Sequence, residues 1–229
     1  MTPEPHPERH RRQLYGRRKG PKLSAHQQQL IETLLPEIAL TLEAHADPKS
    51  YFANVTEVWL EVGFGAGEHM LWQAHHHPHA GIIGAEPYLS GVAKLLSKID
   101  PANIPHLRLY TDDARDIIDA LPDASLGRVF VLFPDPWPKT RHHKRRFVQM
   151  DLLDRLARVM KPGAEFRFAS DDAPYFEWTL ERICAHSDFE WQATSSADWL
   201  RRPADWPQTR YEAKELHGKP AYLRAIRKA

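Results

Sequence analysis

Cysteine is nearly absent from this chain, since Cys184 is the only one in 229 residues. A single thiol cannot form an internal disulfide or supply the ligands of a cysteine-rich zinc or iron–sulfur site. The sequence also lacks an apolar run near the ~18 residues that a membrane-spanning helix needs, and its N-terminus, MTPEPHPERHRRQ, has no apolar stretch of a secretory signal. These absences predict a cytoplasmic protein with no membrane partner.

A metal site is not expected either. The cluster His75-His76-His77-Pro78-His79 offers imidazoles, which are good ligands. No acid or cysteine stands at ligand spacing around it, so a closed coordination set is missing. We therefore interpret the cluster as the surface end of a helix and predict no metal.

Net charge is small, at +1, but the positive charges are segregated. Lysine and arginine gather in residues 1–22, in residues 139–146 and in residues 210–229, which leaves an acidic body between them. Segregated basic segments favour local contact with a polyanion such as nucleic acid. The alternative for any one of them is an ordinary solvated surface.

The length suits one α/β domain with a short extension. Residues 1–22 mix proline, histidine and arginine without apolar periodicity, which predicts a flexible basic arm, and residues 23–229 form the single domain. Strands are expected at 57–62, 81–85, 107–110, 128–133 and 165–169, and helices at 24–44 (broken at Pro36), 68–75, 89–99, 113–120, 147–160 and 175–185.

This alternation predicts a doubly wound, mostly parallel sheet with helices on both faces, because parallel strands need crossover connections. Two more apolar segments, 189–192 and 222–226, have no recognisable helix between them. They bring the sheet to seven strands, and we expect them to be edge strands, one of them antiparallel.

A glycine-rich turn follows the first strand. Gly63, Gly65 and Gly67 let the backbone bend sharply and leave its amides open to a ligand. Glu86, at the end of the second strand, stands where an acid accepts hydrogen bonds from a ribose diol. Glu61 before the turn would repel a pyrophosphate, and the spacing is G-x-G-x-G rather than G-x-G-x-x-G. The pattern favours S-adenosylmethionine over a nicotinamide or flavin nucleotide.

A third acid follows the third strand, where the adenine edge of such a cofactor would lie. Asp113 is our candidate and Asp112 is its rival. Either carboxylate could instead cap the helix that comes next.

The segment from Phe133 to Thr140, FPDPWPKT, places Asp135 at the carboxyl end of a buried strand, where open α/β sheets bind their ligands. Two prolines fix the backbone on either side of this acid, and five lysines and arginines follow in residues 139–146. The arrangement suits an acid that touches a nucleic-acid substrate whose phosphates meet the basic residues.

Together these motifs closely resemble those of the bacterial tRNA (guanine-N7-)-methyltransferases. The likeness is carried by EVGFGAGEH from Glu61, GAEP from Gly84, FPDPWPKTRHHKRR from Phe133, ASDDAPY from Ala169 and TRYEAKELHGKPAYLRAIR from Thr209. The resemblance implies the Rossmann-like class I methyltransferase fold, and transfer of a methyl group from S-adenosylmethionine to N7 of the variable-loop guanine at position 46 of tRNA, which gives 7-methylguanosine.

The resemblance also implies residue roles. Glu61, Glu86, Asp113 and Asp135 would hold the cofactor, and Asp135 would also act at the catalytic centre. Substrate contacts would come from Lys139, Asp171, Thr209, Arg210, Tyr211 and Glu212, and RNA contacts from Arg141, His142, His143, Lys144, Arg145 and Arg146. Asp172 is an alternative to Asp171, and Trp137 could either capture an exposed base or pack in the protein.

The expected chemistry needs no general base, because guanine N7 already presents a lone pair. Positioning and electrostatics must then supply most of the rate acceleration. Two rival functions remain: a tRNA-binding module without catalysis, and a class I methyltransferase for another RNA or a small molecule. The protein could act as a monomer or as a homodimer.

Overall fold

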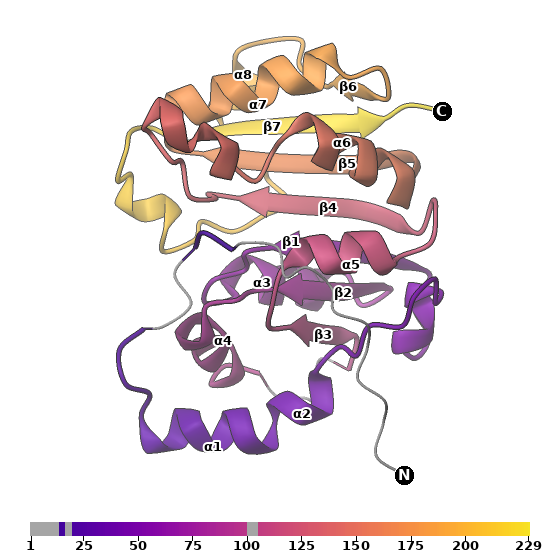
Figure 1. Cartoon of the computed structure of the whole chain (residues 1–229), viewed down its shortest axis with the longest axis vertical. Helices are drawn as coiled ribbons and strands as arrows, with labels where there is room; N and C mark the ends of the chain where they lie inside the picture. The colour runs from indigo at the N-terminus through magenta and orange to yellow at the C-terminus, as the bar shows by residue number, and fades with distance from the viewer. Residues whose placement is uncertain (1–13, 17–19, 100–104) are drawn as a thin grey trace.

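The computed structural model describes residues 14–16, 20–99 and 105–229. Its centre is a seven-stranded sheet with the strand order β3-β2-β1-β4-β5-β7-β6 (Figure 1). The strands are β1 (Glu57–Val62), β2 (Ala80–Ala85), β3 (Leu107–Tyr110), β4 (Leu126–Leu132), β5 (Met160–Ser170), β6 (Phe189–Trp191) and β7 (Ala221–Arg227). The strand order reverses between β1 and β4, and open α/β sheets bind ligands at such a point. The predicted fold class is confirmed.

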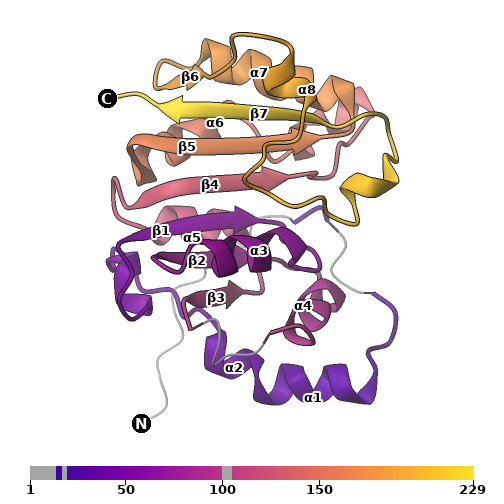
Figure 2. The same cartoon turned by 180° about the vertical axis from the view of Figure 1, so that it is seen from behind.

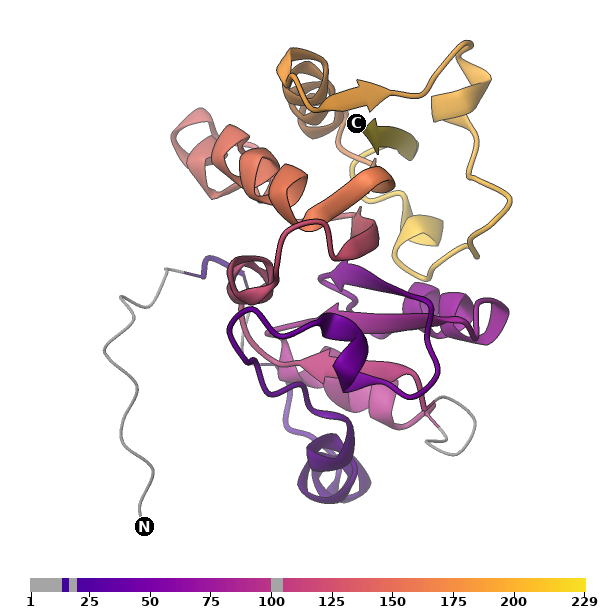
Figure 3. The ribbon, with the colours of Figure 1, turned by 90° about the vertical axis from the view of Figure 1, so that its right-hand side faces the viewer.

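Helices cover both faces of this sheet (Figures 1 and 2). They are α1 (Ala25–Thr33), α2 (Leu35–Ile38), α3 (Glu68–His76), α4 (Leu89–Leu96), α5 (Ala114–Ala120), α6 (Met150–Val159), α7 (Ala173–Ala185) and α8 (Ala197–Leu200), with short 3₁₀ helices η1 (Pro48–Tyr51), η2 (Thr140–Arg145) and η3 (Glu212–Lys214). Two apolar clusters fill the layers, one beneath α5, α6 and α7 and the other beneath α3 and α4. Figure 3, which looks along the strands, shows this two-sided arrangement.

The first helical region is shorter than predicted. Ser24 caps α1 as expected, with its side chain accepting a hydrogen bond from the Gln27 amide. The prediction that helix continues to Ala44 is wrong, because α2 ends at Ile38. The next residues instead extend along the edge of β3, where the Leu40 amide donates to the carbonyl of Leu109 at 2.7 Å. This pairing satisfies backbone groups at the open edge of β3. If the helix had continued, these groups of β3 would have been left to solvent.

The antiparallel pairings involve the two C-terminal strands, as expected. β7 is antiparallel to both of its neighbours, β5 and β6, so it sits one position inside the sheet, and β6 forms the edge. Its pairing with β5 runs from Glu165 opposite Ile226 to Ser170 opposite Ala221. The antiparallel pairings therefore gather at this edge of the sheet, as predicted, with β6 at the edge itself and β7 next to it.

One part of the sheet carries charge instead of an apolar core. Arg128, Glu165, Arg167 and Arg224 form hydrogen bonds and ion pairs across β4, β5 and β7. Asp205, from the loop of residues 201–212, completes the network with a 2.7 Å bond from Arg167. This ionic contact fixes the loop that carries several of the predicted substrate residues.

Among the residues that the structure describes, no helix has the length and apolar composition needed to cross a membrane. Within the same residues, no group of three or more histidine, cysteine, aspartate or glutamate side chains is placed to hold a metal ion.

Candidate active site

A cavity of about 680 Å³ opens at the carboxyl edge of the parallel strands. Its lining comes from residues 14–16, the ends of β1, β2 and β4, the start of α5, the end of η2 with the first part of α6, and Tyr211 of the loop of residues 201–212. It includes Val62, Gly63, Glu86, Tyr88, Asp113, Arg115, Phe133, Asp135, Trp137 and Tyr211. The predicted cofactor and catalytic positions Gly63, Glu86, Asp113 and Asp135 therefore share one cavity.

The three glycines of the turn have different roles. All have positive φ values, of 71° at Gly63, 56° at Gly65 and 72° at Gly67, which residues with a Cβ rarely adopt. A Cβ at Gly63 or Gly65 would meet no protein atom within 4 Å, whereas one at Gly67 would come within 2.3 Å of Leu95. Gly67 is thus required for packing against α4. No side chain covers the backbone at the other two, of which Gly63 lines the cavity.

Glu86 connects the turn to the end of β2. Its two carboxylate oxygens accept hydrogen bonds from the amides of Gly65 and Tyr88, both at 2.8 Å. Burial raises the pKa of this carboxyl, and these two amide bonds act in the opposite direction. Each oxygen retains a lone pair, so the carboxylate can still accept from a ligand hydroxyl.

Glu61 lies beneath the turn and is not among the cavity-lining residues. It is buried, and its Oε2 is 2.6 Å from Nδ1 of His69 in the first turn of α3. The sequence reasoning did not identify this histidine as a partner of Glu61.

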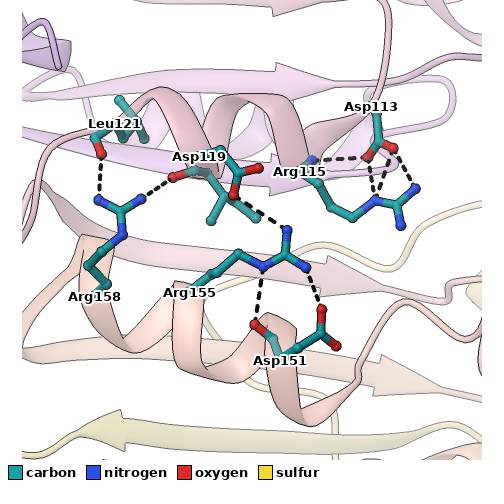
Figure 4. A network of polar contacts seen from close by, with 8 residues as sticks. Asp113, Arg115, Asp119, Leu121, Asp151, Arg155 and Arg158 are labelled. Atoms are coloured by element: carbon teal, nitrogen blue, oxygen red, sulfur yellow. Dashed lines mark hydrogen bonds and ion pairs between the residues drawn. The ribbon is translucent and has the colours of Figure 1, made fainter. Parts of the chain in front are cut away.

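Asp113 has a role in the helix as well as in the cavity. Its side chain caps α5 through the Arg115 amide and also binds the guanidinium of Arg115 (Figure 4). The same figure shows two contacts from α6 to the far end of α5. Arg155 donates to the Asp119 carboxylate, and Arg158 donates to the carbonyl of Leu121. Asp113 caps α5 and lines the cavity, whereas its rival Asp112 does not line it.

These residues fit S-adenosylmethionine better than a dinucleotide. The open space above the Cα atoms of Gly63 and Gly65 leaves room for a ligand against the backbone, and Glu86 offers acceptors for a ribose diol. Glu61 precedes the turn and Glu68 follows it. These two acids suit a ligand with an ammonium group and would repel a pyrophosphate.

The loop that carries Asp135 is held in an unusual conformation. Phe133 and Trp137, on either side of it, have φ values of 50° and 46°, in the left-handed region that bulky residues rarely occupy. The Phe133 amide donates to the carbonyl of Ala169 at 2.8 Å, which fixes the start of the loop. Asp135 itself is exposed and lines the cavity.

Arg146 holds this loop from inside, which corrects the prediction that it contacts phosphate. It is only 2% exposed, and its guanidinium donates to the carbonyl of Pro136 at 2.9 Å and to that of Pro174 at 3.3 Å. It also lies over the rings of Tyr175 and Trp178, at 4.9 Å and 5.0 Å from their centroids. A buried residue with these partners supports the loop and offers no surface charge to RNA.

The other basic residues of this segment remain accessible. Arg141 and Lys144 are exposed, and Lys139, at the start of η2, is exposed as well. The side chains of His142 and His143 are half-buried beside aromatic rings, His142 near Trp137 and His143 near Trp178.

The sequence Thr209-Arg210-Tyr211-Glu212 forms a capping box that sequence reasoning missed. The Thr209 hydroxyl accepts from the Glu212 amide at 3.1 Å, and the Glu212 carboxylate accepts from the Thr209 amide at 3.3 Å. Glu212 is buried and also accepts from the hydroxyl of Tyr222 at 2.6 Å and from Arg202 at 3.1 Å. The threonine-x-x-glutamate spacing was the available signal.

Asp171 and Asp172 have separate roles. Asp172 caps α7 by accepting from the Tyr175 amide at 2.8 Å. Asp171 is buried and accepts from the amide of His217 at 3.1 Å. Tyr211, 37% exposed, lies 5.6 Å from Phe133 between ring centroids, and burial raises its hydroxyl pKa, with further contributions from Asp171 and Asp135.

Residues 14–16 form a wall of the cavity that sequence reasoning did not foresee. The prediction of a flexible arm covers residues 1–22, of which 1–13 and 17–19 lie outside the described residues. Tyr15 stands edge-on to Trp137, 6.1 Å between centroids, and the Arg145 guanidinium lies over both rings at 4.7 Å and 4.9 Å. The apolar pair Leu14-Tyr15 in an otherwise polar stretch was the only sequence signal.

Comparisons with known proteins identify the family of this chain. The family model Methyltransf_4, "Putative methyltransferase", matches residues 55–224. The tRNA (guanine-N(7)-)-methyltransferase of Brucella abortus (strain 2308) is 49% identical over 233 residues, covering 100% of both chains. The protein of that name from Rhodospirillum rubrum is 49% identical over 218 residues, which cover 92% of this chain and 86% of the relative.

Solved structures share the fold at low sequence identity. The 16S rRNA methyltransferase KamB superposes with a TM-score of 0.52 at 16% identity, covering 84% of this chain and 98% of that one. The antibiotic-resistance methyltransferase Kmr gives a TM-score of 0.50 at 17% identity, covering 82% and 95%. With the family model and full-length relatives in agreement, this chain belongs to the tRNA (guanine-N(7)-)-methyltransferase family.

Proposed function

We propose that this enzyme transfers the methyl group of S-adenosylmethionine to N7 of a variable-loop guanine in tRNA. The observation that carries the proposal is the single cavity shared by the glycine turn, Glu86 and Asp135, with Tyr211 at its edge. The acceptor is a tRNA, so we also propose that the enzyme works in the cytoplasm.

The cofactor would be held by backbone and carboxylates. Glu86 would accept hydrogen bonds from its ribose hydroxyls, Asp113 would accept from the adenine amino group, and Glu61 would balance the ammonium of its amino-acid end. When bound, S-adenosylmethionine supplies a methyl group on a cationic sulfur. The residues around it bind and orient, and none has to form a covalent bond.

Asp135 would act on the base. The lone pair of guanine N7 forms the new bond to the methyl carbon, and the electrons of the broken sulfur–carbon bond stay on sulfur. The purine becomes cationic in this step, so a carboxylate nearby stabilises the developing charge. The rigid, strained loop would hold Asp135 in place before the substrate arrives.

Tyr211 and Asp171 would recognise the guanine from the side opposite Asp135. The Tyr211 ring is partly exposed at the mouth and can stack on an unstacked base, as aromatic residues do in RNA recognition. Asp171 would accept from the N1 and N2 hydrogens of guanine. The Thr209–Glu212 capping box would keep Tyr211 and Arg210 in place rather than read the base itself.

The basic residues of η2 and its surroundings would hold the RNA backbone. Lys139, Arg141 and Lys144 are exposed point charges, which contact phosphate without reading sequence. Arg145 and His142 lie beside Trp137, which lines the cavity, and would contact the RNA near the target base. His143 lies beside Trp178 and would contact the RNA backbone.

Methyl transfer to a tRNA transcript, followed by mapping of 7-methylguanosine, tests this function. A matched transcript with 7-deazaguanosine at the mapped position should accept no methyl group, because it lacks the nitrogen that attacks. Methylation of the 7-deaza transcript at that position, or of a different atom, would overturn the assignment. The non-catalytic alternative predicts that S-adenosylhomocysteine leaves the melting temperature unchanged, whereas a cofactor site predicts an increase.

A further inference from the structure

Beneath the glycine turn lies a buried chain of polar contacts that the proposed chemistry does not use. His69 bridges Glu61 on β1 and Gln73 on α3, at 2.6 Å and 3.1 Å. Gln73 in turn donates to the backbone carbonyl of Asp205 at 2.8 Å. The chain therefore runs from the cofactor turn to the loop of residues 201–212.

The hydrogen-bond partners fix the tautomer of the neutral His69 ring. The carbonyl of Asp205 can only accept, so the atom of Gln73 that faces it is the amide nitrogen. The same nitrogen meets Nε2 of His69, which must then be the acceptor. The proton of a neutral imidazole therefore resides on Nδ1, which donates to Glu61.

The surroundings leave the imidazole little freedom. His69 is buried, and its ring lies edge-on to Phe130 and Trp206, with centroids 4.6 Å and 5.5 Å away. Trp206 belongs to the loop of residues 201–212. A second link between this loop and α3 is the hydrogen bond from the Arg210 amide to Glu68, at 2.6 Å.

We infer that His69 is a positioning residue for the amino-acid end of the cofactor: it holds the Glu61 carboxylate in one orientation and ties it to the loop that carries Tyr211. The inference rests on the proposed function, in which Glu61 balances the cofactor's ammonium. Without the imidazole the carboxylate loses its fixed donor, and the ammonium would have to orient it on binding.

Calorimetry on the ligand-free protein with two ligands tests the inference. S-adenosylhomocysteine carries the amino-acid end, and 5′-methylthioadenosine shares the adenosyl thioether but lacks that end. His69→Leu should weaken S-adenosylhomocysteine about tenfold, the loss expected for one hydrogen bond to a charged group, and leave 5′-methylthioadenosine within about twofold. His69→Asn, whose amide can replace the Nδ1 donor, should recover most of the affinity.

A matched control is His106→Leu. His106 is also buried and bonds α3 through the Ala74 carbonyl at 2.9 Å, but it does not contact Glu61. It should lower the melting temperature without changing the affinity ratio of the two ligands. If the leucine variant of His69 does not fold, Gln73→Met frees Nε2 while keeping the contact to Glu61, and should weaken S-adenosylhomocysteine selectively, by about threefold.

Equal weakening of both ligands, an unchanged ratio in the His69 or Gln73 variants, or failure of asparagine to recover affinity would overturn the inference. A wild-type protein that binds neither ligand would instead contradict the proposed cofactor site. The two failures are therefore distinguishable.

Discussion

The cofactor side and the reaction side of the cavity are built differently. On the proposed cofactor side, Glu86 and Asp113 line the cavity and Glu61 lies beneath it; all three are buried, and each is bound by a partner within the protein. On the reaction side, Asp135 is exposed on a loop whose neighbours have left-handed backbones. The first side is already organised without ligand. The second is open to water, and its carboxylate gains electrostatic strength when RNA excludes that water.

Removing the charge on the reaction side should have the largest effect. We expect Asp135→Asn to lower kcat by about 10²- to 10³-fold, the range seen when one preorganised electrostatic group is removed. Affinity for S-adenosylhomocysteine should fall far less, because three other acids serve that side. Single-turnover methyl transfer and calorimetry separate the two quantities.

The matching change on the cofactor side is Glu86→Gln, which should affect ligand affinity more than kcat at saturating cofactor. Near-normal turnover by Asp135→Asn would remove the contrast between the two sides.

Arg146 supports the reaction side from within, so its loss should appear as instability. Arg146→Ala removes hydrogen bonds to two carbonyls and contacts with two aromatic rings. We expect the free energy of unfolding to fall by about 2 to 3 kcal/mol. Chemical denaturation measures it, and Arg141→Ala, at an exposed position of the same segment, is the control. Equal stability of the two variants would contradict a structural role for Arg146.

The cofactor side should respond to pH through Glu86. Burial raises its pKa above the ordinary value of 4.5, and ribose hydroxyls need the ionised carboxylate as acceptor. Binding thus favours the deprotonated form, and affinity for S-adenosylhomocysteine should fall as the pH drops through this raised pKa, up to about tenfold per pH unit. Glu86→Gln should abolish this dependence, and a wild-type affinity that stays constant until pH 4.5 would disprove it.

The smallest effect is expected from the exposed basic residues of η2. Replacing Arg141 and Lys144 with glutamine should reduce the slope of log affinity for tRNA against log salt by about 1 to 2 units, since each phosphate contact releases counterions. Lys49→Gln, exposed on η1 beside β1, removes one charge away from the cavity, so the change in slope is compared per charge removed. If both changes alter the slope equally, the η2 segment contributes no specific phosphate contact.

The sequence predicted the parts of this fold that depend on local periodicity. Alternating apolar strands and amphipathic helices led to the correct sheet class, and the glycine turn and Glu86 were placed beside one cavity. Periodicity carries no information on strand order, so the sequence could not say which of the two C-terminal strands, β6 or β7, forms the edge of the sheet. The end of the first helix was missed because a tertiary contact with β3 decides it.

The candidate site shows the same limit. An arginine within a run of basic residues is predicted to lie on the surface. Arg146 is nevertheless buried, because carbonyl groups and aromatic rings from distant parts of the chain surround it. Glu212 was expected at the substrate, whereas its partners Tyr222 and Arg202 come from a strand and a loop that sequence spacing does not bring together. The residue types were therefore enough to predict where the cavity lies. Which charged side chains face it depends on tertiary contacts that the sequence does not reveal.

A structure of the protein with S-adenosylhomocysteine tests the central claim most directly. We predict that the ligand lies along the glycine turn, with its ribose hydroxyls at Glu86, its adenine beside Asp113 and its sulfur directed toward Asp135. Density for the ligand in another part of the molecule, or with the ribose away from Glu86, would contradict the account.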